Sequence, residues 1–240
     1  MNLPENKKRN VEIPDHKVVW IYGKPFSGKT TFASNFPDVL MLNTDGNIQF
    51  IDSPYISIKD KVETMGRLTK RQFAWETFKE TVKELEKKEN TYKTIVIDLI
   101  EDLYDMCRVY EYDQMGIHHE SDEPFKSYDI IRNEFFRELK KLTAAGYENI
   151  VFISHEDESQ IISRKTATTK SGMVTYIKPN ITNKVANKIS GMCTVVGRVI
   201  IEDGERKLTF SPDENVFSGG RISNMTIPLT YEALDEIYKK

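Results

Sequence analysis

Short apolar runs alternate with longer amphipathic stretches along most of the chain. Apolar runs of strand length occur at residues 17–22, 39–42, 94–98 and 149–154. Amphipathic or helix-initiating patterns predict helices at residues 30–35, 71–88, 99–106, 128–142 and 230–240. Alternation of this kind is typical of an α/β fold, so we expect a mostly parallel central sheet with helices on both faces.

The pattern changes after residue 154. Two strand-like runs at 194–202 and 206–210 flank the turn sequence Asp203-Gly204-Glu205, which predicts a C-terminal β-hairpin. A chain of 240 residues forms one large domain or two small ones. We expect a single domain over residues 13–240, preceded by a polar, disordered tail at residues 1–12.

Composition and charge narrow the class of protein. The chain carries 34 basic and 37 acidic residues and has a formal net charge of −3. It has only two cysteines, Cys107 and Cys193, which are too few for a disulfide framework and suit a reducing compartment. No apolar run reaches the roughly 18–20 residues of a membrane span, and the N-terminus lacks the apolar segment of a secretory signal. We therefore expect a cytoplasmic protein without a membrane partner.

A glycine-rich segment between the first predicted strand and the first predicted helix fits the pattern G-x-x-x-x-G-K-[ST]. Its residues are Gly23, Lys24, Pro25, Phe26, Ser27, Gly28, Lys29 and Thr30, and the helix continues with Thr31. Such a loop binds a phosphate chain because its backbone N–H groups can point inward where side chains would block them. We expect these nine residues to bind ATP, with Lys29 at the β- and γ-phosphates and the Thr30 hydroxyl on Mg²⁺.

A carboxylate for that metal should stand at the carboxyl end of a neighbouring strand. Asp98 ends the run 94–98 and fits this role. An Asp that closes a strand is also common as a plain cap. The phosphate loop upstream favours the metal ligand, so Thr30 and Asp98 are the predicted metal-binding residues.

Two further polar residues follow predicted strands. Asp45 comes after the strand at 39–42 and could activate the attacking water, although an Asp before Gly46 is also an ordinary turn residue. His155 follows the strand at 149–154 and could contact the γ-phosphate or the water. The alternative for His155 is a half-exposed side chain at a strand end.

Positive charge gathers in one stretch of this mildly acidic chain. Residues 159–201 hold seven basic side chains and no acidic one. The seven are Arg164, Lys165, Lys170, Lys178, Lys184, Lys188 and Arg198. The segment 164–172 is rich in Thr, Ser and Gly, which predicts a mobile loop that could contact nucleic-acid phosphates or could simply be a solvated basic loop.

The order of these features resembles the RecA-like ATPase core, over about residues 17–210. The phosphate loop is followed in turn by Asp45, Asp98 and His155. Gly-Lys-Thr-Thr-Phe-Ala33, Val-Ile-Asp98 and Ile-Ser-His155-Glu156 are similar to the phage-encoded RecA-like proteins of the Sak group, described as phage AAA-family nucleotide-binding proteins.

This resemblance implies a phage recombination ATPase that binds single-stranded DNA, anneals complementary strands and works with a single-strand DNA-binding protein. It places DNA-contacting loops near residues 111–127 and 157–178. The second loop contains Arg164, Lys165, Lys170 and Lys178, whereas the first is acidic here. RecA-like assemblies complete each ATP site from the next subunit, so the resemblance implies a homo-oligomeric ring or filament, with Arg221 the expected contributor.

Two departures from the RecA-like pattern bear on the rate. Asp45 stands where these proteins place a Glu, and His155 stands where they place a Gln, so we expect slow hydrolysis. Two other functions use the same loop. One is a small-molecule or nucleotide kinase, in which the basic stretch would be a lid over the substrates. The other is an interaction module of the helicase-loader type, which binds ATP and hardly hydrolyses it.

Overall fold

The computed structural model describes residues 6–7, 16–66, 68–118, 127–162, 173–211, 213, 215–222 and 225–238. In chain order the elements are β1 (Lys17–Gly23), α1 (Lys29–Ser34), β2 (Val39–Asn43), β3 (Tyr55–Ser57), β4 (Lys61–Met65), β5 (Leu68–Gln72), α2 (Ala74–Glu86), β6 (Thr94–Asp98), α3 (Ile100–Met115), α4 (Ser127–Ala144), β7 (Asn149–Ile162), β8 (Met173–Pro179), α5 (Asn183–Ser190), β9 (Val195–Glu202), β10 (Glu205–Thr209), β11 (Gly219–Gly220), β12 (Thr226–Pro228) and α6 (Tyr231–Tyr238).

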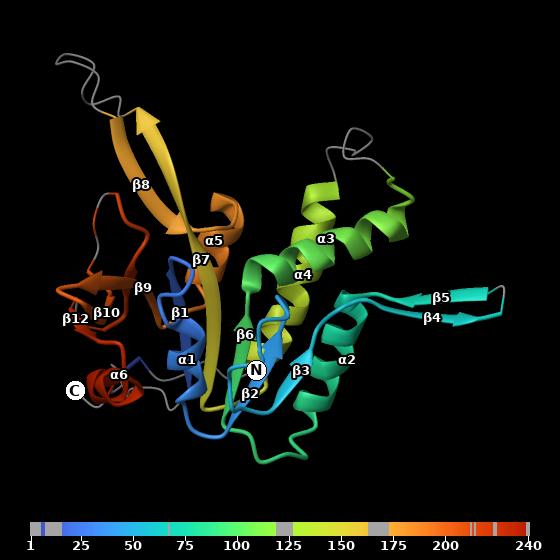
Figure 1. Ribbon diagram of the computed structural model, residues 1–240, viewed down its shortest axis with the longest axis horizontal. Helices are drawn as coiled ribbons and strands as arrows, with labels where there is room; N and C mark the ends of the chain where they lie inside the picture. The colour runs from blue at the N-terminus through green and yellow to red at the C-terminus, as the bar shows by residue number, and fades with distance from the viewer. Residues whose placement is uncertain are drawn as a thin grey trace.

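One sheet runs through the molecule in the order β12-β10-β9-β1-β7-β6-β2-β3, with β11 paired to β9 and β8 paired to β7 (Figure 1). The pairs β9–β1, β1–β7, β7–β6, β6–β2 and β2–β3 are parallel. β2 and β6 are buried along their whole length, and β1 is buried apart from Lys17, which explains their nearly continuous apolar sequences. The predicted mostly parallel sheet is confirmed.

Helices cover both faces of the sheet. Alternate residues of β1 point to opposite faces, so that Trp20 and Tyr22 join one apolar cluster and Val19 and Ile21 join the other. The first cluster includes residues of α2, α3, α4 and α5, and the second includes residues of α1 and α6. The α/β architecture therefore has two hydrophobic cores, one on each side of the central strands.

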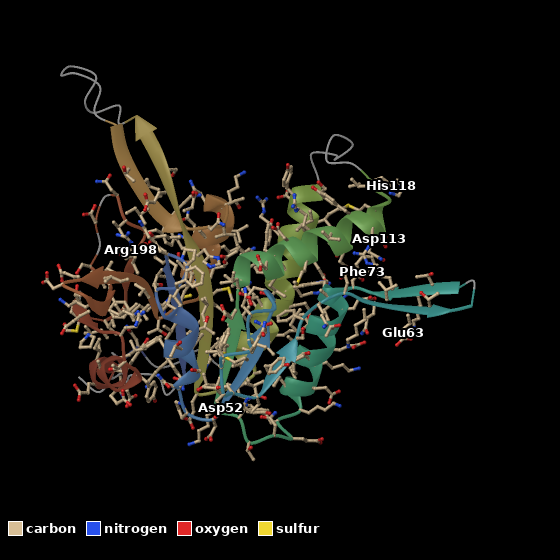
Figure 2. The ribbon with its side chains drawn as sticks, in the orientation of Figure 1. Asp52, Glu63, Phe73, Asp113, His118 and Arg198 are labelled. Atoms are coloured by element: carbon tan, nitrogen blue, oxygen red, sulfur yellow. The ribbon has the colours of Figure 1, made fainter. Side chains whose placement is uncertain are left out.

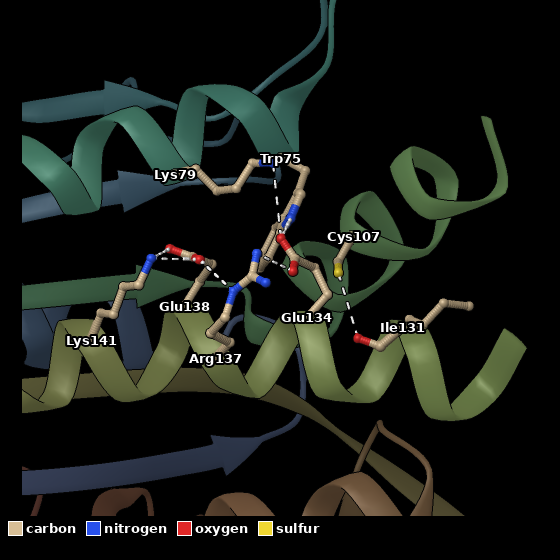
Figure 3. Close-up of polar contacts among 8 residues, drawn as sticks. All are labelled: Trp75, Lys79, Cys107, Ile131, Glu134, Arg137, Glu138 and Lys141. Atoms are coloured by element: carbon tan, nitrogen blue, oxygen red, sulfur yellow. Dashed lines mark hydrogen bonds and ion pairs between the residues drawn. The ribbon is translucent and has the colours of Figure 1, made fainter. Parts of the chain in front are cut away.

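Polar contacts connect α2 and α4 above the first core (Figure 3). The buried Trp75 indole of α2 donates to Glu134 Oε1 of α4 at 3.2 Å, and Glu134 also pairs with Arg137. Lys141 Nζ donates to Glu138 Oε1 at 2.8 Å one turn further along α4. Glu134 and Glu138 are both buried, and these contacts supply the partners that their carboxylates need there.

Most predicted elements are confirmed with small shifts at their ends. The C-terminal hairpin forms from β9 and β10, and both Asp203 (φ 54°) and Gly204 (φ 80°) have the positive φ that a two-residue turn of this kind requires. The hydroxyl of Thr230 accepts from the Ala233 N–H at the start of α6, as the sequence predicts. Cys107 and Cys193 are buried and free.

Two antiparallel arms extend from the body and were not predicted (Figure 1). β4 and β5 form a separate two-stranded sheet, so the predicted helix at 71–88 starts later, at Ala74. β7 continues to Ile162 and pairs with β8, so both ends of the predicted loop at 157–178 are strands. α5 was not predicted either. Apart from residues 6–7, the predicted tail lies outside the described residues.

Candidate nucleotide site

The loop between β1 and α1 surrounds the Lys29 side chain. Lys29 is 5% exposed, and its Nζ donates to the carbonyl oxygens of Gly23 (3.0 Å) and Lys24 (2.8 Å). Burial lowers the pKa of Lys29, and the charges of Asp98 and Glu101 act in the opposite direction. Gly28 has φ 91°, which favours glycine, and it precedes the first residue of α1.

Close packing inside the loop explains why small residues stand there. A Cβ on Gly23 would lie 3.0 Å from the Val199 carbonyl oxygen and 3.3 Å from Ser27 Oγ. Ser27 is 3% exposed, and its hydroxyl has no hydrogen-bond partner among the described residues. A buried hydroxyl without a partner costs free energy, and an anion bound in the loop would supply that partner. The loop therefore fits a phosphate chain.

Thr30 and Asp98 meet although they are 68 positions apart. Thr30 Oγ1 donates to Asp98 Oδ2 at 2.8 Å. Burial raises the pKa of Asp98 to about 6, and the Thr30 hydroxyl and the Lys29 charge limit that rise. A hydroxyl and a carboxylate are hard oxygen donors of the kind that Mg²⁺ prefers, so the predicted metal pair fits that ion.

The backbone around Asp98 is held by the end of β2. The Thr44 N–H donates to the Asp98 carbonyl oxygen at 2.9 Å, and Thr44 Oγ1 donates to the Leu99 carbonyl oxygen at 2.9 Å. Because β2 and β6 are parallel neighbours, their carboxyl ends lie at the same edge of the sheet. Thr44 was not predicted to have this role.

His155 stands beside the loop, as predicted. It pairs with Gly23 in the register of β1 and β7. Burial lowers the pKa of His155, the positive charge of Lys29 lowers it further and Asp45 acts in the opposite direction, so the net shift favours the neutral imidazole. A neutral imidazole has one nitrogen that donates and one that accepts.

Glu101 is a residue of this site that the sequence analysis missed. It lies in the first turn of α3, is 8% exposed, and its Oε1 accepts the His155 backbone N–H at 2.7 Å. Burial raises the pKa of Glu101 to about 7, against the effect of the hydrogen bonds that it accepts. The available signal in the sequence was its position three residues after Asp98, at the start of the helix that follows the strand.

Asp45 forms an ordered turn at the edge of the site. Its Oδ1 accepts from the Asn43 side chain (2.8 Å) and from the Asn47 N–H (2.9 Å), and its Oδ2 accepts from the Asn47 side chain (3.1 Å). Its charge acts on Asp98 and His155, so it lies within electrostatic reach of both. Asp45 is therefore an ordered turn residue and also lies near the site.

An ion-pair cluster flanks the loop on its β9 side. Arg198 Nε donates to Glu156 Oε2 at 3.0 Å, and Lys24 Nζ lies 3.0 Å from Glu158 Oε1 (Arg198 is labelled in Figure 2). Glu156 is almost fully buried, so Arg198 neutralises a charge that would otherwise be costly. The cluster joins the loop to the base of the β7–β8 arm.

The other predicted residues do not gather at this site. Arg164, Lys165 and Lys170 lie outside the described residues. Lys178 lies in β8, 3.6 Å from Asp157, and lines a cavity of about 870 Å³. The Arg221 backbone N–H donates to the Thr194 carbonyl oxygen, just before β9 begins, at the opposite edge of the sheet from the loop of the same chain.

A mostly parallel sheet with a phosphate-type loop after its central strand, and an acidic residue closing a strand two positions away, is the arrangement of the P-loop NTPase fold. The chain belongs to the AAA domain family AAA_24, whose model matches residues 15–222. No curated protein matches the sequence.

The solved structures that are similar to this chain include two proteins that share 13% of its sequence. One is the RadB recombinase, with a TM-score of 0.40 and 13% identity over 80% of this chain and 79% of that one. The other is the flagellar accessory protein FlaH from Methanocaldococcus jannaschii, with a TM-score of 0.37 and 13% identity over 80% of this chain and 76% of that one. Among the described residues, no helix is long and apolar enough to cross a membrane.

Proposed function

We propose that this protein is an ATP- and Mg²⁺-dependent ATPase that binds single-stranded DNA and acts in phage recombination or strand annealing. The observation that carries the ATPase part is the contact between Thr30 Oγ1 and Asp98 Oδ2 at 2.8 Å, beside the buried Lys29. These three side chains come from two separate motifs, and each is of the chemical type that its role requires.

Each side chain then has a distinct task. Lys29 exchanges its two carbonyl partners for phosphate oxygens, because an ammonium group binds the more negative acceptor more strongly. Thr30 and Asp98 hold the metal, and bound Mg²⁺ would neutralise charge on the β- and γ-phosphates. His155, in its neutral form, hydrogen-bonds the γ-phosphate or the attacking water, and Asp45 orients or activates that water.

The DNA-binding part draws on the basic stretch and on the cavity beside the site. Arg108, Arg132, Lys178 and Lys184 line the cavity together with Tyr104, and Asp105 and Asp129 in the same lining pair with Arg108 and Arg132. Basic side chains that track phosphates, combined with aromatic rings for base stacking, are the features that bind single strands without sequence preference. Glu101 lines the same cavity and bonds to His155, which supports a route between bound DNA and the nucleotide.

The first experiment measures ATP turnover with and without single-stranded DNA, for the wild type and for Lys29→Ala. We expect DNA to stimulate the wild type and the variant to lose ATP binding and turnover. Turnover that DNA leaves unchanged, with phosphate transferred to a nucleoside monophosphate, would instead support the kinase. Tight ATP binding with hardly any turnover would support the interaction module.

The second experiment tests the basic segment 164–172. Substituting Arg164, Lys165 and Lys170 with Ala should weaken single-strand affinity and reduce the slope of log K against log [salt] by up to about 2, since each phosphate contact contributes roughly 0.7. Substituting the exposed Lys59, Lys83 and Lys140 removes the same charge elsewhere and is the control. If the two triple variants changed single-strand affinity and salt slope equally, a specific DNA contact by the segment 164–172 would be excluded.

A further inference from the structure

The sheet order gives a bound nucleotide a direction. Asp98 closes β6, two strands from β1 on one side, and β10 lies two strands from β1 on the other side. Adjacent strands are about 4.8 Å apart, so each lies roughly 10 Å from the loop. If its terminal phosphates and metal lie toward Asp98, a nucleotide that runs across the sheet has its nucleoside end on the other side of the loop, toward β10.

Arg206 of β10 stands at that end of the loop. A Cβ placed on Gly28 would lie 3.2 Å from Arg206 Cδ and 3.3 Å from Arg206 Nε, so the guanidinium stem packs directly against the loop. Leu229 is the next neighbour, with Cδ2 at 3.8 Å from the same position. Gly28 favours this approach, since a Cβ there would require the arginine side chain to shift by a few tenths of an ångström.

The Arg206 side chain is free to serve a ligand. It is exposed, and no hydrogen bond or ion pair of its guanidinium is present among the described residues. The neighbouring cations on this side of the loop differ: Arg198 pairs with Glu156, and Lys207 pairs with Glu202 at 2.8 Å. Arg206 alternates with Lys207 along β10, so it shares the face of Leu208, which belongs to the same apolar cluster as α1.

We propose that Arg206 is a nucleotide-binding residue that stacks its planar guanidinium on the base of the bound nucleotide, with Leu229 beside it. The assignment rests on the proposed ATP site. A guanidinium is planar, delocalised and weakly hydrated, so it stacks on an aromatic face in a way that an ammonium group does not. The phosphate loop alone cannot recognise a base, and Arg206 supplies that contact.

The test compares the dissociation constants of ATP and of inorganic tripolyphosphate, both with Mg²⁺, by calorimetry. We expect Arg206→Ala to weaken ATP about tenfold, in line with the loss of one stacking contact, and to leave tripolyphosphate within twofold. Arg206→Lys keeps the charge without the plane and should not restore ATP affinity. Lys207→Ala, on the other face of the same strand, should bind both ligands as the wild type does.

Unchanged ATP affinity in Arg206→Ala would overturn the assignment, as would an equal loss for tripolyphosphate or full recovery in Arg206→Lys. These outcomes differ from failure of the proposed function, in which the wild type itself would bind neither ligand. Arg206 is exposed, so matching unfolding midpoints of the variants and the wild type establish that each variant is folded.

Discussion

At the scale of single residues, the site depends on carboxylates buried next to cations and hydrogen-bond donors. Asp98, which ends β6, and Glu101, in the first turn of α3, are 2% and 8% exposed. Burial raises the pKa of Asp98 to about 6 and that of Glu101 to about 7. Both shifts oppose ionisation, so ionising either carboxylate in the folded protein costs folding free energy.

Glu101 makes that cost measurable as a pH dependence of stability. Its pKa rises from the ordinary 4.5 to about 7 in the folded protein, so the folded form binds its proton more tightly. The contribution of Glu101 is therefore most favourable below pH 4.5, falls as the pH rises, and is fully lost above pH 7, by about 3 kcal/mol. Glu101→Gln removes this dependence while it keeps an oxygen to accept the His155 N–H.

Urea unfolding at pH 5 and pH 8 checks this prediction. The unfolding free energy of Glu101→Gln minus that of the wild type should be larger at pH 8 than at pH 5. The exposed Glu236→Gln is the control and should show no such change. A Glu101→Gln stability difference that is the same at both pH values would contradict the buried, protonation-linked state of this carboxyl group.

At the scale of elements, the β9–β10 hairpin connects the second core to the phosphate loop. Leu208 and Phe210 of this segment are fully buried, and Arg206 extends the same face toward Gly28. Gly197 of β9 faces these two side chains: a Cβ there would lie 2.7 Å from both Leu208 Cδ1 and Phe210 Cε1. The hairpin can lie close to β9 only because position 197 has no side chain.

Gly197→Ala should therefore destabilise the protein by about 1–3 kcal/mol, because both buried side chains must shift. Gly191→Ala is the matched control. Its Cβ would meet its nearest atoms at an ordinary 3.6 Å, and Gly191 has φ −63° in the αR region, so the change should be neutral or slightly stabilising. Denaturant midpoints measure both effects, and equal midpoints for the two variants would refute the close packing at position 197.

At the scale of the whole molecule, the candidate site and Arg221 lie at opposite edges of the sheet. The loop follows the carboxyl end of β1, whereas Arg221 is bonded next to the start of β9, which runs parallel to β1. Arg221 is exposed and donates weakly to the Gly191 carbonyl oxygen at 3.5 Å. An Arg221 that acts in ATP hydrolysis must act on a second copy of the chain.

Mixing two inactive variants tests this prediction. Lys29→Ala lacks a working nucleotide site and Arg221→Ala lacks the cation, so each alone should lose turnover, by as much as about 10³-fold for the arginine. A mixture contains interfaces that join an intact site to an intact Arg221, and its turnover should recover in part. If turnover did not recover in the mixture, or if Arg221→Ala had wild-type turnover, a role of Arg221 at the site of a second copy would be excluded.

Local patterns in the sequence determined the central part of this fold. β1, β2, β6 and the first half of β7 are short apolar runs that are buried on both faces, so composition alone indicates them. The loop from Gly23 to Thr30 is a contiguous motif, and its glycines indicate where the backbone needs a positive φ or a close contact. Asp98 was predictable because ligands bind at the carboxyl ends of the strands in an open α/β sheet, and Asp98 ends β6, two strands from β1.

Only the tertiary structure decided the arms and the second layer of the site. β7 beyond Ser154 is mostly polar, and it is a strand because β8 pairs with it, not because of its own pattern. Glu101 meets His155 across 54 positions, and Arg206 meets Gly28 through the approach of a distant hairpin. Contacts of this kind depend on which strands become neighbours, and that choice is made by packing across the whole sheet, which leaves no periodic signal in the residues concerned.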